Sequence, residues 1–218
     1  MSRLREYSLF LKEYRASFHD TGSLVPSGRA LCRELASRLA ADGHSGRRIL
    51  EAGPGTGVVT RQLLPLLREG DRLTIVELNP KFVALLREKF ASGGEWERHA
   101  DAVEVLEMPI QELNGEPRFD YVVSSLPLSN FACELIETIF ATFHQVAAEG
   151  AELSFFEYAG LRRVKGLFVD RAERLRLSGV DRVFAEEFAR SEFGRQLVLA
   201  NFPPAFVHHL SLGKQSTD

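Results

Sequence analysis

Short apolar runs alternate with amphipathic stretches along most of the chain, and this alternation limits the possible folds more than any other feature. Strand-like apolar runs cover 47–53, 71–78, 118–125 and 151–158. The segments between them repeat apolar residues at helical spacing, over 58–70, 80–90 and 132–150. Pro80 suits the first turn of the second helix, and Gly150 is expected to end the third. Strands and helices that alternate at this spacing predict an α/β fold, in which helices cover both faces of a parallel sheet.

The last part of the chain departs from this rhythm. Residues 195–212 hold two β-rich runs separated only by Asn201-Phe202-Pro203-Pro204. So short a connection has no room for a crossover helix, and the two strands are therefore predicted to be antiparallel. The expected sheet is mostly parallel and is closed by an antiparallel C-terminal strand.

A glycine-rich loop, LEAGPGTG at 50–57, follows the first predicted strand. Three glycines at alternate positions permit a sharp turn and let a ligand lie against bare backbone. A generic nucleotide-binding loop is the simpler interpretation. Against it, Glu51 stands at the strand end, where it suits an ammonium group better than a pyrophosphate. The loop residues expected to contact the cofactor are Gly53, Pro54, Gly55, Thr56 and Gly57.

Three further features follow the loop in order. Glu77 and Leu78 end the next strand, where a carboxylate can accept two hydrogen bonds from a ribose diol. Within HADAV, Asp101 and Ala102 are expected to face an adenine ring and its amino group. Ser124 and Ser125 begin the turn SSLPL after the 118–125 strand.

This order of motifs, over roughly residues 47–128, resembles the cofactor site of class I methyltransferases. The resemblance implies a Rossmann-like fold with a seven-stranded sheet. It also implies S-adenosylmethionine as the cofactor rather than a nicotinamide. The glycine loop alone would be a weak signal, whereas the loop, the acid at the next strand end and the SSLPL turn together are specific.

The SSLPL turn bears on the substrate. Many amino-group methyltransferases carry an Asn/Asp-Pro-Pro-aromatic turn here, but this chain has Ser125 and Leu128 at the polar and aromatic positions. A flipped nucleobase needs both stacking and edge recognition. A primary amine on a flexible headgroup needs neither. The net charge of −3 also gives no general attraction to nucleic acid, so no nucleic-acid partner is expected.

The chain of 218 residues is expected to divide into an N-terminal segment, 1–26, and a methyltransferase domain, 27–218. Residues 3–18 place apolar and aromatic side chains on one helical face with cations beside it. The helix is either a lid on the domain or an interfacial membrane helix, and both roles remain open. In the second, Tyr7, Phe10 and Tyr14 would contact the membrane.

A second cationic segment, 161–177, holds six Lys or Arg and two Asp or Glu, a local net charge of +4. It is either a solvated charged helix or a patch for anionic headgroups or an RNA backbone. In the second interpretation Arg162, Arg163 and Lys165 carry the contact.

Five stretches, 21–31, 50–57, 125–128, 155–158 and 201–205, resemble bacterial phospholipid N-methyltransferases. Those enzymes convert phosphatidylethanolamine stepwise to phosphatidylcholine at the membrane surface, and relatives methylate ornithine lipids. The glycine loop is also shared with rRNA adenine dimethyltransferases, the alternative class. The resemblance implies a cytoplasmic monomer on the inner leaflet, with a membrane lipid and an anionic bilayer as partners.

Candidate catalytic residues follow from that resemblance. They are Ser125, Glu157 and Tyr158, with Ser23 and Ser27 closing over the methionine end of the cofactor. Glu157 departs from the small or hydroxyl residue expected there, which leaves ethanolamine and ornithine headgroups both open. The amine's proton acceptor is Glu157, or Asp20 with His19, or water. No metal site is expected. Cys32 and Cys133, in helical patterns, are expected to be free thiols.

Overall fold

The computed structural model describes residues 28–116, 118–159 and 171–213. Seven strands form one sheet in the order β3-β2-β1-β4-β5-β7-β6. The strands are β1 Arg48–Ala52, β2 Arg72–Glu77, β3 Val103–Glu107, β4 Phe119–Ser124, β5 Ala147–Tyr158, β6 Glu192–Val198 and β7 Ala205–Ser211. The first five run parallel, and β7 is antiparallel to both β5 and β6. The mostly parallel sheet with an antiparallel C-terminal hairpin is confirmed.

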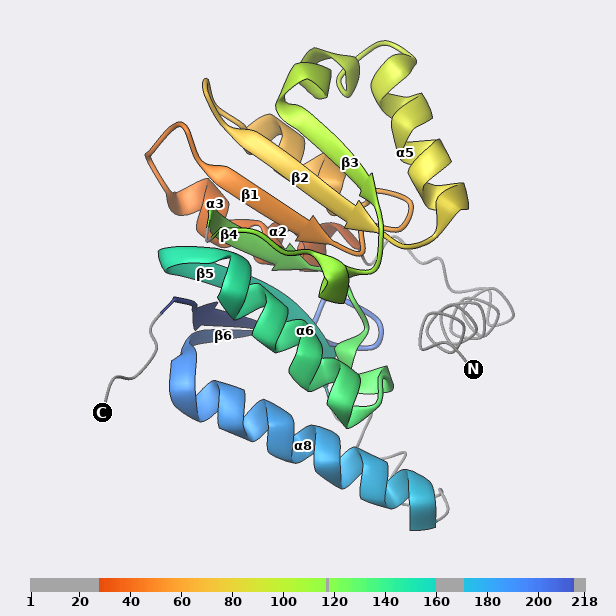
Figure 1. Cartoon of the computed structure of the whole chain (residues 1–218), viewed down its shortest axis with the longest axis vertical. Coiled ribbons are helices and arrows are strands. Elements are labelled where there is room, and N and C mark those ends of the chain that lie inside the picture. The colour runs from red at the N-terminus through yellow and green to blue at the C-terminus, as the bar shows by residue number, and fades with distance from the viewer. Residues whose placement is uncertain (1–27, 117, 160–170, 214–218) are drawn as a thin grey trace.

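Helices cover both faces of the sheet (Figure 1). They are α2 Gly28–Leu35, α3 Ser37–Ala41, α4 Thr60–Leu63, α5 Pro80–Ala91, α6 Cys133–Val146 and α8 Arg171–Ser191. Helices α6 and α8 pack on one face, and Leu50, Val122, Phe140 and Phe184 share that core. Helices α2, α4 and α5 pack on the other, around Ile49, Ile75, Leu63 and Leu86. Successive apolar residues of β1 point to opposite faces of the sheet: Ile49 packs in one core and Leu50 in the other. Both faces of the sheet are therefore buried.

Two helices end earlier than predicted. The helix expected over 58–70 consists of α4 followed by one 3-10 turn, Leu64–Leu66, because Pro65 has no N–H and disrupts the preceding helical turn. The helix expected to reach Gly150 ends at Val146, and β5 begins at the next residue. Gly150, with φ of +76°, lies inside β5, where four residues of β5, 148–151, lie opposite the single residue Asp120 of β4. The glycine therefore serves an irregular strand and does not cap a helix.

Strand β3, which follows Ala102 directly, was not predicted from the sequence, and neither were the bounds of α2 and α3. Helix α8 extends the helical pattern far beyond the cationic segment, to Ser191. Residues 3–18, Ser23, Ser27 and 161–170 lie outside the described residues, so the roles expected for Tyr7, Phe10, Tyr14, Arg162, Arg163 and Lys165 stay predictions. None of the described helices has the length and apolar content to span a bilayer.

The amino edge of the sheet is fastened by a buried ion pair between Arg47 and Asp71. Arg47 Nη2 lies 2.6 Å from Asp71 Oδ2, and the guanidinium also donates to the carbonyl oxygens of Leu39 and Leu66. Burial opposes ionisation of Asp71, but hydrogen bonds from Arg47 and from the Arg68 N–H leave its pKa below the ordinary value. One side chain thus joins α3, the end of the α4 turn and the start of β2.

Candidate active site

The candidate site is a cavity of about 260 Å³ at the carboxyl edge of the sheet. It lies where the strand order reverses between β1 and β4, the place where ligands bind in open parallel sheets. Its walls come from α2, the loop after β1, the ends of β2 and β3, the turn after β4, and Phe156 on β5. In Figure 1 the arrowheads of β1 and β2 point to this edge.

The glycine loop makes the sharp turn that the sequence predicts. Gly53, Gly55 and Gly57 have φ of +71°, +60° and +82°, in the left-handed region that favours glycine. The N–H of Gly53 donates to the Val76 carbonyl, which holds the loop against β2. A Cβ on Gly53 would lie 2.4 Å from Leu126 Cδ2, so the approach of the loop to the turn after β4 requires glycine.

Glu77 lies in the cavity wall at the end of β2, as predicted. Its side chain is held by two backbone N–H groups: Gly55 N donates to Oε2 at 3.0 Å, and Asn79 N donates to Oε1 at 2.8 Å. Each carboxylate oxygen keeps a further lone pair. The acid therefore ties the glycine loop to β2 and still offers two acceptors to a diol in the cavity.

Glu51 is fully buried and is not itself among the cavity-lining residues, but its charge acts on Cys32, which lines the cavity. Thr60 Oγ1 donates to its Oε2 at 2.8 Å, and its Oε1 has no hydrogen-bond partner among the described residues. Burial raises the pKa of Glu51 to about 8, and the charge of Glu77 adds to that rise. A buried carboxylate with one unpaired oxygen fits the ammonium group expected there.

The turn after β4 carries a second unpaired polar atom. Ser125 lines the cavity, and its N–H donates to the Ala52 carbonyl at 2.9 Å, but its buried Oγ has no hydrogen-bond partner among the described residues. Ser124 lies under the turn, where its Oγ accepts from Leu126 N at 3.4 Å. Leu128 is fully buried in the α6 core. The residue at the aromatic position is thus turned away from the cavity.

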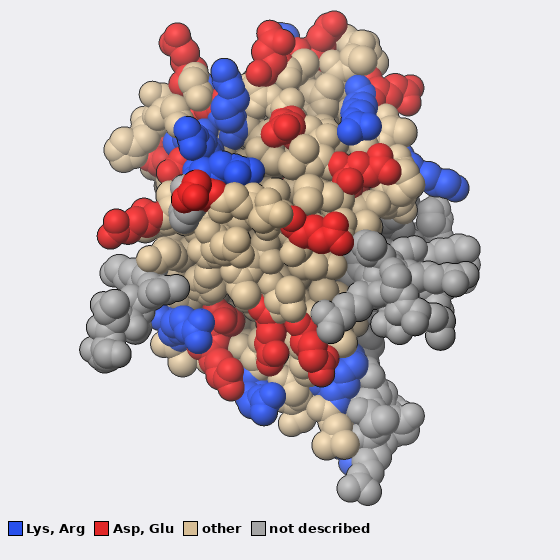
Figure 2. All heavy atoms as spheres, in the orientation of Figure 1, with Lys and Arg blue, Asp and Glu red and all other residues tan. Residues whose placement is uncertain are grey.

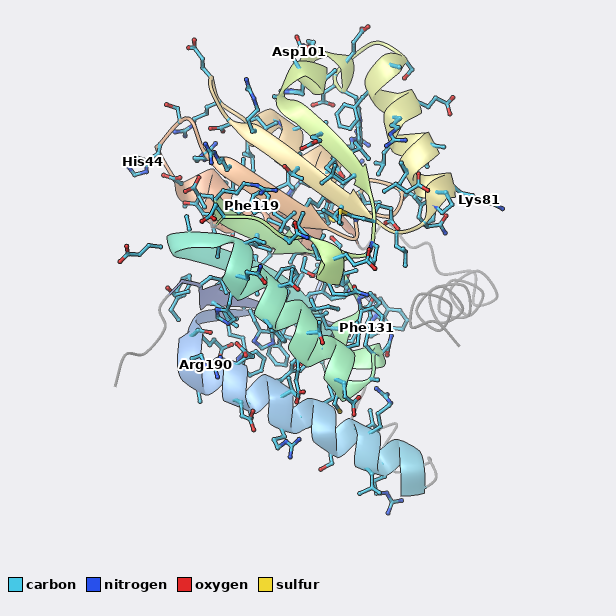
Figure 3. The ribbon with its side chains drawn as sticks, viewed as in Figure 1. His44, Lys81, Asp101, Phe119, Phe131 and Arg190 are labelled. Atoms are coloured by element: carbon cyan, nitrogen blue, oxygen red, sulfur yellow. The ribbon has the colours of Figure 1, made fainter. Side chains whose placement is uncertain are left out.

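Asp101 and Ala102 are not at the site, which corrects the sequence-based assignment. They end a 3-10 helix before β3, and Val103, the next residue, pairs with Leu73 at the start of β2. Asp101 is therefore at the amino edge, and Figure 3 shows it far from Phe131. Met108 and Ile110, which follow β3, line the cavity instead. Recognising 103–107 as a strand would have pointed to them.

Glu157 and Tyr158 are not among the cavity-lining residues, although both end β5 at this edge. Glu157 Oε1 lies 3.5 Å from His208 Nε2, and His208 Nδ1 lies 2.6 Å from Glu192 Oε1. The His208 ring stacks on Phe188 at 4.3 Å. Phe156, on the opposite face of β5, reaches the cavity, and its ring is 5.4 Å from that of Tyr158. No feature of the sequence distinguished Phe156 from its neighbours.

Of the other residues predicted to contact the cofactor, some line the cavity and some do not. Pro54 and Leu78 line the cavity, whereas Thr56 is exposed and its carbonyl accepts from Lys89 Nζ at 2.6 Å. Cys32 lines the cavity as a buried free thiol, and burial raises its pKa to about 11. Cys133 is a free, half-buried thiol. In the described part of the chain, no cluster of His, Cys, Asp or Glu is arranged to hold a metal ion.

This fold and site define a class I S-adenosylmethionine-dependent methyltransferase, and the chain belongs to that family. The methyltransferase domain family matches residues 49–150. S-adenosylmethionine is the cofactor, and the site fits it: a bare glycine turn, a diol acceptor in Glu77 and an unpaired buried oxygen on Glu51.

The chain is also similar to individual proteins of known name. The chain is 30% identical over 145 residues to an ornithine lipid N-methyltransferase of Singulisphaera acidiphila, a match that covers 66% of this chain and 74% of that protein. It is 34% identical to ribosomal RNA small subunit methyltransferase A of Pseudomonas putida, over 40% of this chain and 31% of that protein. A Burkholderia thailandensis 1,6-didemethyltoxoflavin-N1-methyltransferase, solved with S-adenosylhomocysteine, shares the fold. Its TM-score is 0.63 at 19% identity, over 98% of this chain and 92% of that one.

Proposed function

We propose that the chain methylates the headgroup amine of a membrane lipid at the membrane surface. The turn after β4 carries the proposal: it offers the cavity one small hydroxyl, on Ser125, and buries Leu128 where base-methylating enzymes present an aromatic ring. A site of this shape suits a slender aliphatic amine. The similarity to an ornithine lipid N-methyltransferase supports the same class of substrate.

The chain's contribution to the reaction is chiefly positioning. S-adenosylmethionine supplies the electrophilic methyl group, and the amine attacks it in line. The Ser125 Oγ, whose hydrogen-bonding capacity is unused, would accept one amine N–H and so aim the nitrogen lone pair into the cavity. A lipid ammonium has a pKa near ~10 and must first lose a proton. Because Glu157 faces His208 and is absent from the cavity wall, we assign that proton to water rather than to Glu157.

Two lipid headgroups are candidates. The N-terminal and hairpin motifs favour phosphatidylethanolamine, and the named relative favours ornithine lipid. The ornithine amine is carried on a longer arm and has no phosphate beside it. The assay below separates the two headgroups by the rate at which each lipid takes up label.

An RNA substrate is the alternative class, and less supports it. The ribosomal RNA methyltransferase match spans under a third of that protein. Acidic and basic side chains are interspersed on the face shown in Figure 2, without the single-sign patch that a phosphate backbone attracts.

The test supplies methyl-labelled S-adenosylmethionine to the enzyme with three substrates in parallel: phosphatidylethanolamine vesicles, ornithine-lipid vesicles and undermethylated ribosomal RNA. Label in either lipid is expected, and the faster lipid identifies the headgroup. Ser125→Ala should lower lipid turnover by about tenfold or more, since it removes one hydrogen bond to the nucleophile.

The matched control is Ser129→Ala, immediately after the same turn, which should retain full turnover, because Ser129 does not line the cavity. Both variants should bind S-adenosylhomocysteine like the parent protein. Label in RNA alone would overturn the proposal.

A further inference from the structure

Exposed apolar side chains gather toward the edge of the sheet that carries the cavity. Six large apolar side chains are exposed among the described residues: Val58, Leu175, Phe193, Leu197, Leu199 and Phe202. Phe193 is at the amino end of β6. Val58 lies in the glycine loop, and the pairing of Val198 with Ala205 and of Ala205 with Tyr158 puts the β6–β7 connection at the carboxyl edge. Val58, Leu199 and Phe202 therefore lie at the edge that carries the cavity.

Leu175 lies near the beginning of α8. Its neighbour Arg176 donates from Nη1 to the carbonyl oxygens of Phe131, at 2.8 Å, and Ser129, at 3.4 Å. Those carbonyls follow the turn after β4, so the Arg176 side chain ties the beginning of α8 to the segment after that turn.

The connection between β6 and β7, residues 199–204, carries the two most exposed of these side chains. Leu199 is 72% exposed and Phe202 75%. The backbone that holds them is braced: the N–H of Ala159, at the end of β5, donates to the Pro204 carbonyl at 2.7 Å, and the buried Asn201 donates from Nδ2 to the Pro203 carbonyl at 2.7 Å. An ordered loop thus presents Leu199 and Phe202 to the surroundings.

The chemistry of this loop favours one occupant. From 197 to 207 the chain has no charged residue, in a protein with 26% charged residues. Arg195, just before this stretch, lies over the Phe206 ring at 5.2 Å, the distance of a cation–π contact. The loop thus has an uncharged apolar tip, followed by an aromatic ring and a cation. At a bilayer interface, apolar groups lie among the acyl chains, and aromatic and cationic groups lie nearer the headgroups, which is the same order.

We propose that the β6–β7 connection is a membrane-insertion loop, which places Leu199 and Phe202 among the acyl chains and holds the cavity edge against the bilayer. The inference deepens the proposed function and rests on it, because a lipid amine reaches the cavity without leaving the membrane only if this edge faces the bilayer. The carboxyl edge then has two tasks, binding the cofactor and docking on the surface that supplies the substrate.

The first test places a fluorescent reporter at the tip. The chain has one tryptophan, Trp96, so Trp96→Phe with Phe202→Trp leaves a single indole on the loop. Vesicles of equal parts phosphatidylcholine and phosphatidylglycerol should shift its emission to the blue, and brominated acyl chains should quench it. The matched control carries Phe193→Trp on the opposite end of β6, and its emission should stay that of an exposed indole.

The second test removes the apolar surface. Leu199→Ser with Phe202→Ser should lower the vesicle partition coefficient by about tenfold or more, whereas Phe193→Ser should leave it unchanged. Unchanged affinity for S-adenosylhomocysteine establishes that the variants are folded. An indole at 202 that ignores vesicles, or a double variant that sediments with them like the parent, overturns the inference. So does a parent dimer that the double variant dissociates, since the loop would then bind a second copy.

Failure of this inference is distinguishable from failure of the proposed function. Insertion is read without turnover, and turnover is read separately on detergent-solubilised lipid, where docking is not needed. Insertion without lipid methylation would refute the proposed substrate alone. Lipid methylation without insertion would refute the loop's role alone.

Discussion

Three buried side-chain oxygens lack a hydrogen-bond partner among the described residues, and two of them, Glu51 Oε1 and Ser125 Oγ, say most about the chemistry at the residue scale. An unsatisfied buried polar group costs free energy, so a ligand that completes such a group gains affinity. One belongs to an acid and suits a cation; the other belongs to a hydroxyl and suits an amine N–H. Glu51 is at the end of β1 and is assigned to cofactor binding, whereas Ser125 follows β4 and is assigned to orienting the substrate. Each role can therefore be tested by its own substitution.

Glu51 gives cofactor binding a pH dependence. Its pKa in the free protein is about 8, above the ordinary value for a carboxyl group, so the acid is protonated below that pH and must release its proton to receive an ammonium. Affinity for S-adenosylhomocysteine should therefore rise from pH 6 toward 8, by up to about tenfold per pH unit, and then level off. Titration calorimetry across that range measures the slope.

Glu51→Gln cannot ionise, so its affinity should be low and flat over the same range. Glu104→Gln, an exposed change on β3, should keep the parent slope. A parent protein whose affinity ignores pH would contradict the role assigned to Glu51.

At the scale of elements, the sequence predicted the central strands and the C-terminal hairpin but missed β3, one of the two edge strands. Runs such as 71–78 read as strands because burial on two sides demands continuous apolar residues. Strand β3 has one neighbour and alternates Val and Leu with Glu, so it does not stand out. Without it, Asp101 was assigned to the site from its local motif alone. A short motif can be assigned to the site only when it is known which end of the neighbouring strand it lies at.

The buried Arg47–Asp71 pair fastens three elements, so its loss should destabilise the whole fold. Arg47→Ala leaves the Asp71 carboxylate buried and uncompensated, and the free energy of unfolding should fall by about 3–5 kcal/mol. Urea denaturation followed by circular dichroism measures it. The adjacent exposed Arg48→Ala should change it by less than about 0.5 kcal/mol. Equal effects of the two substitutions would show that the ion pair does not hold the amino edge.

At the scale of the whole molecule, the sequence predicted the architecture, the cofactor and the position of the glycine loop, but not the walls of the cavity. The walls depend on which face of β5 and which end of β3 meet the carboxyl edge, and pairing partners far apart in the chain decide both. Glu157 and Phe156 are adjacent in sequence, yet only Phe156 lines the cavity. Local patterns identify elements, whereas long-range register selects the side chains of the site.

Membrane binding should contain two components that salt separates. The cationic segments predicted at 3–18 and 161–177 act through charge, which roughly 1 M salt screens to a Debye length of about 3 Å. Insertion of Leu199 and Phe202 is apolar and should survive. Vesicle sedimentation of the parent should therefore weaken but persist at high salt, whereas the double serine variant should lose its residual binding. Complete release of the parent by salt would show that charge alone holds it.

The order of strands in the hairpin has a consequence for biosynthesis. Strand β7 follows β6 in the chain but lies between β5 and β6 in the sheet. As the polypeptide leaves the ribosome, β6 emerges first and has no strand to join, since its neighbour is still being translated. Until β7 arrives, β5 keeps an open row of backbone donors and acceptors, which other nascent chains can pair with. A product cut short before β7 would keep that edge, so aggregation and proteolysis, rather than partial activity, are its expected fate.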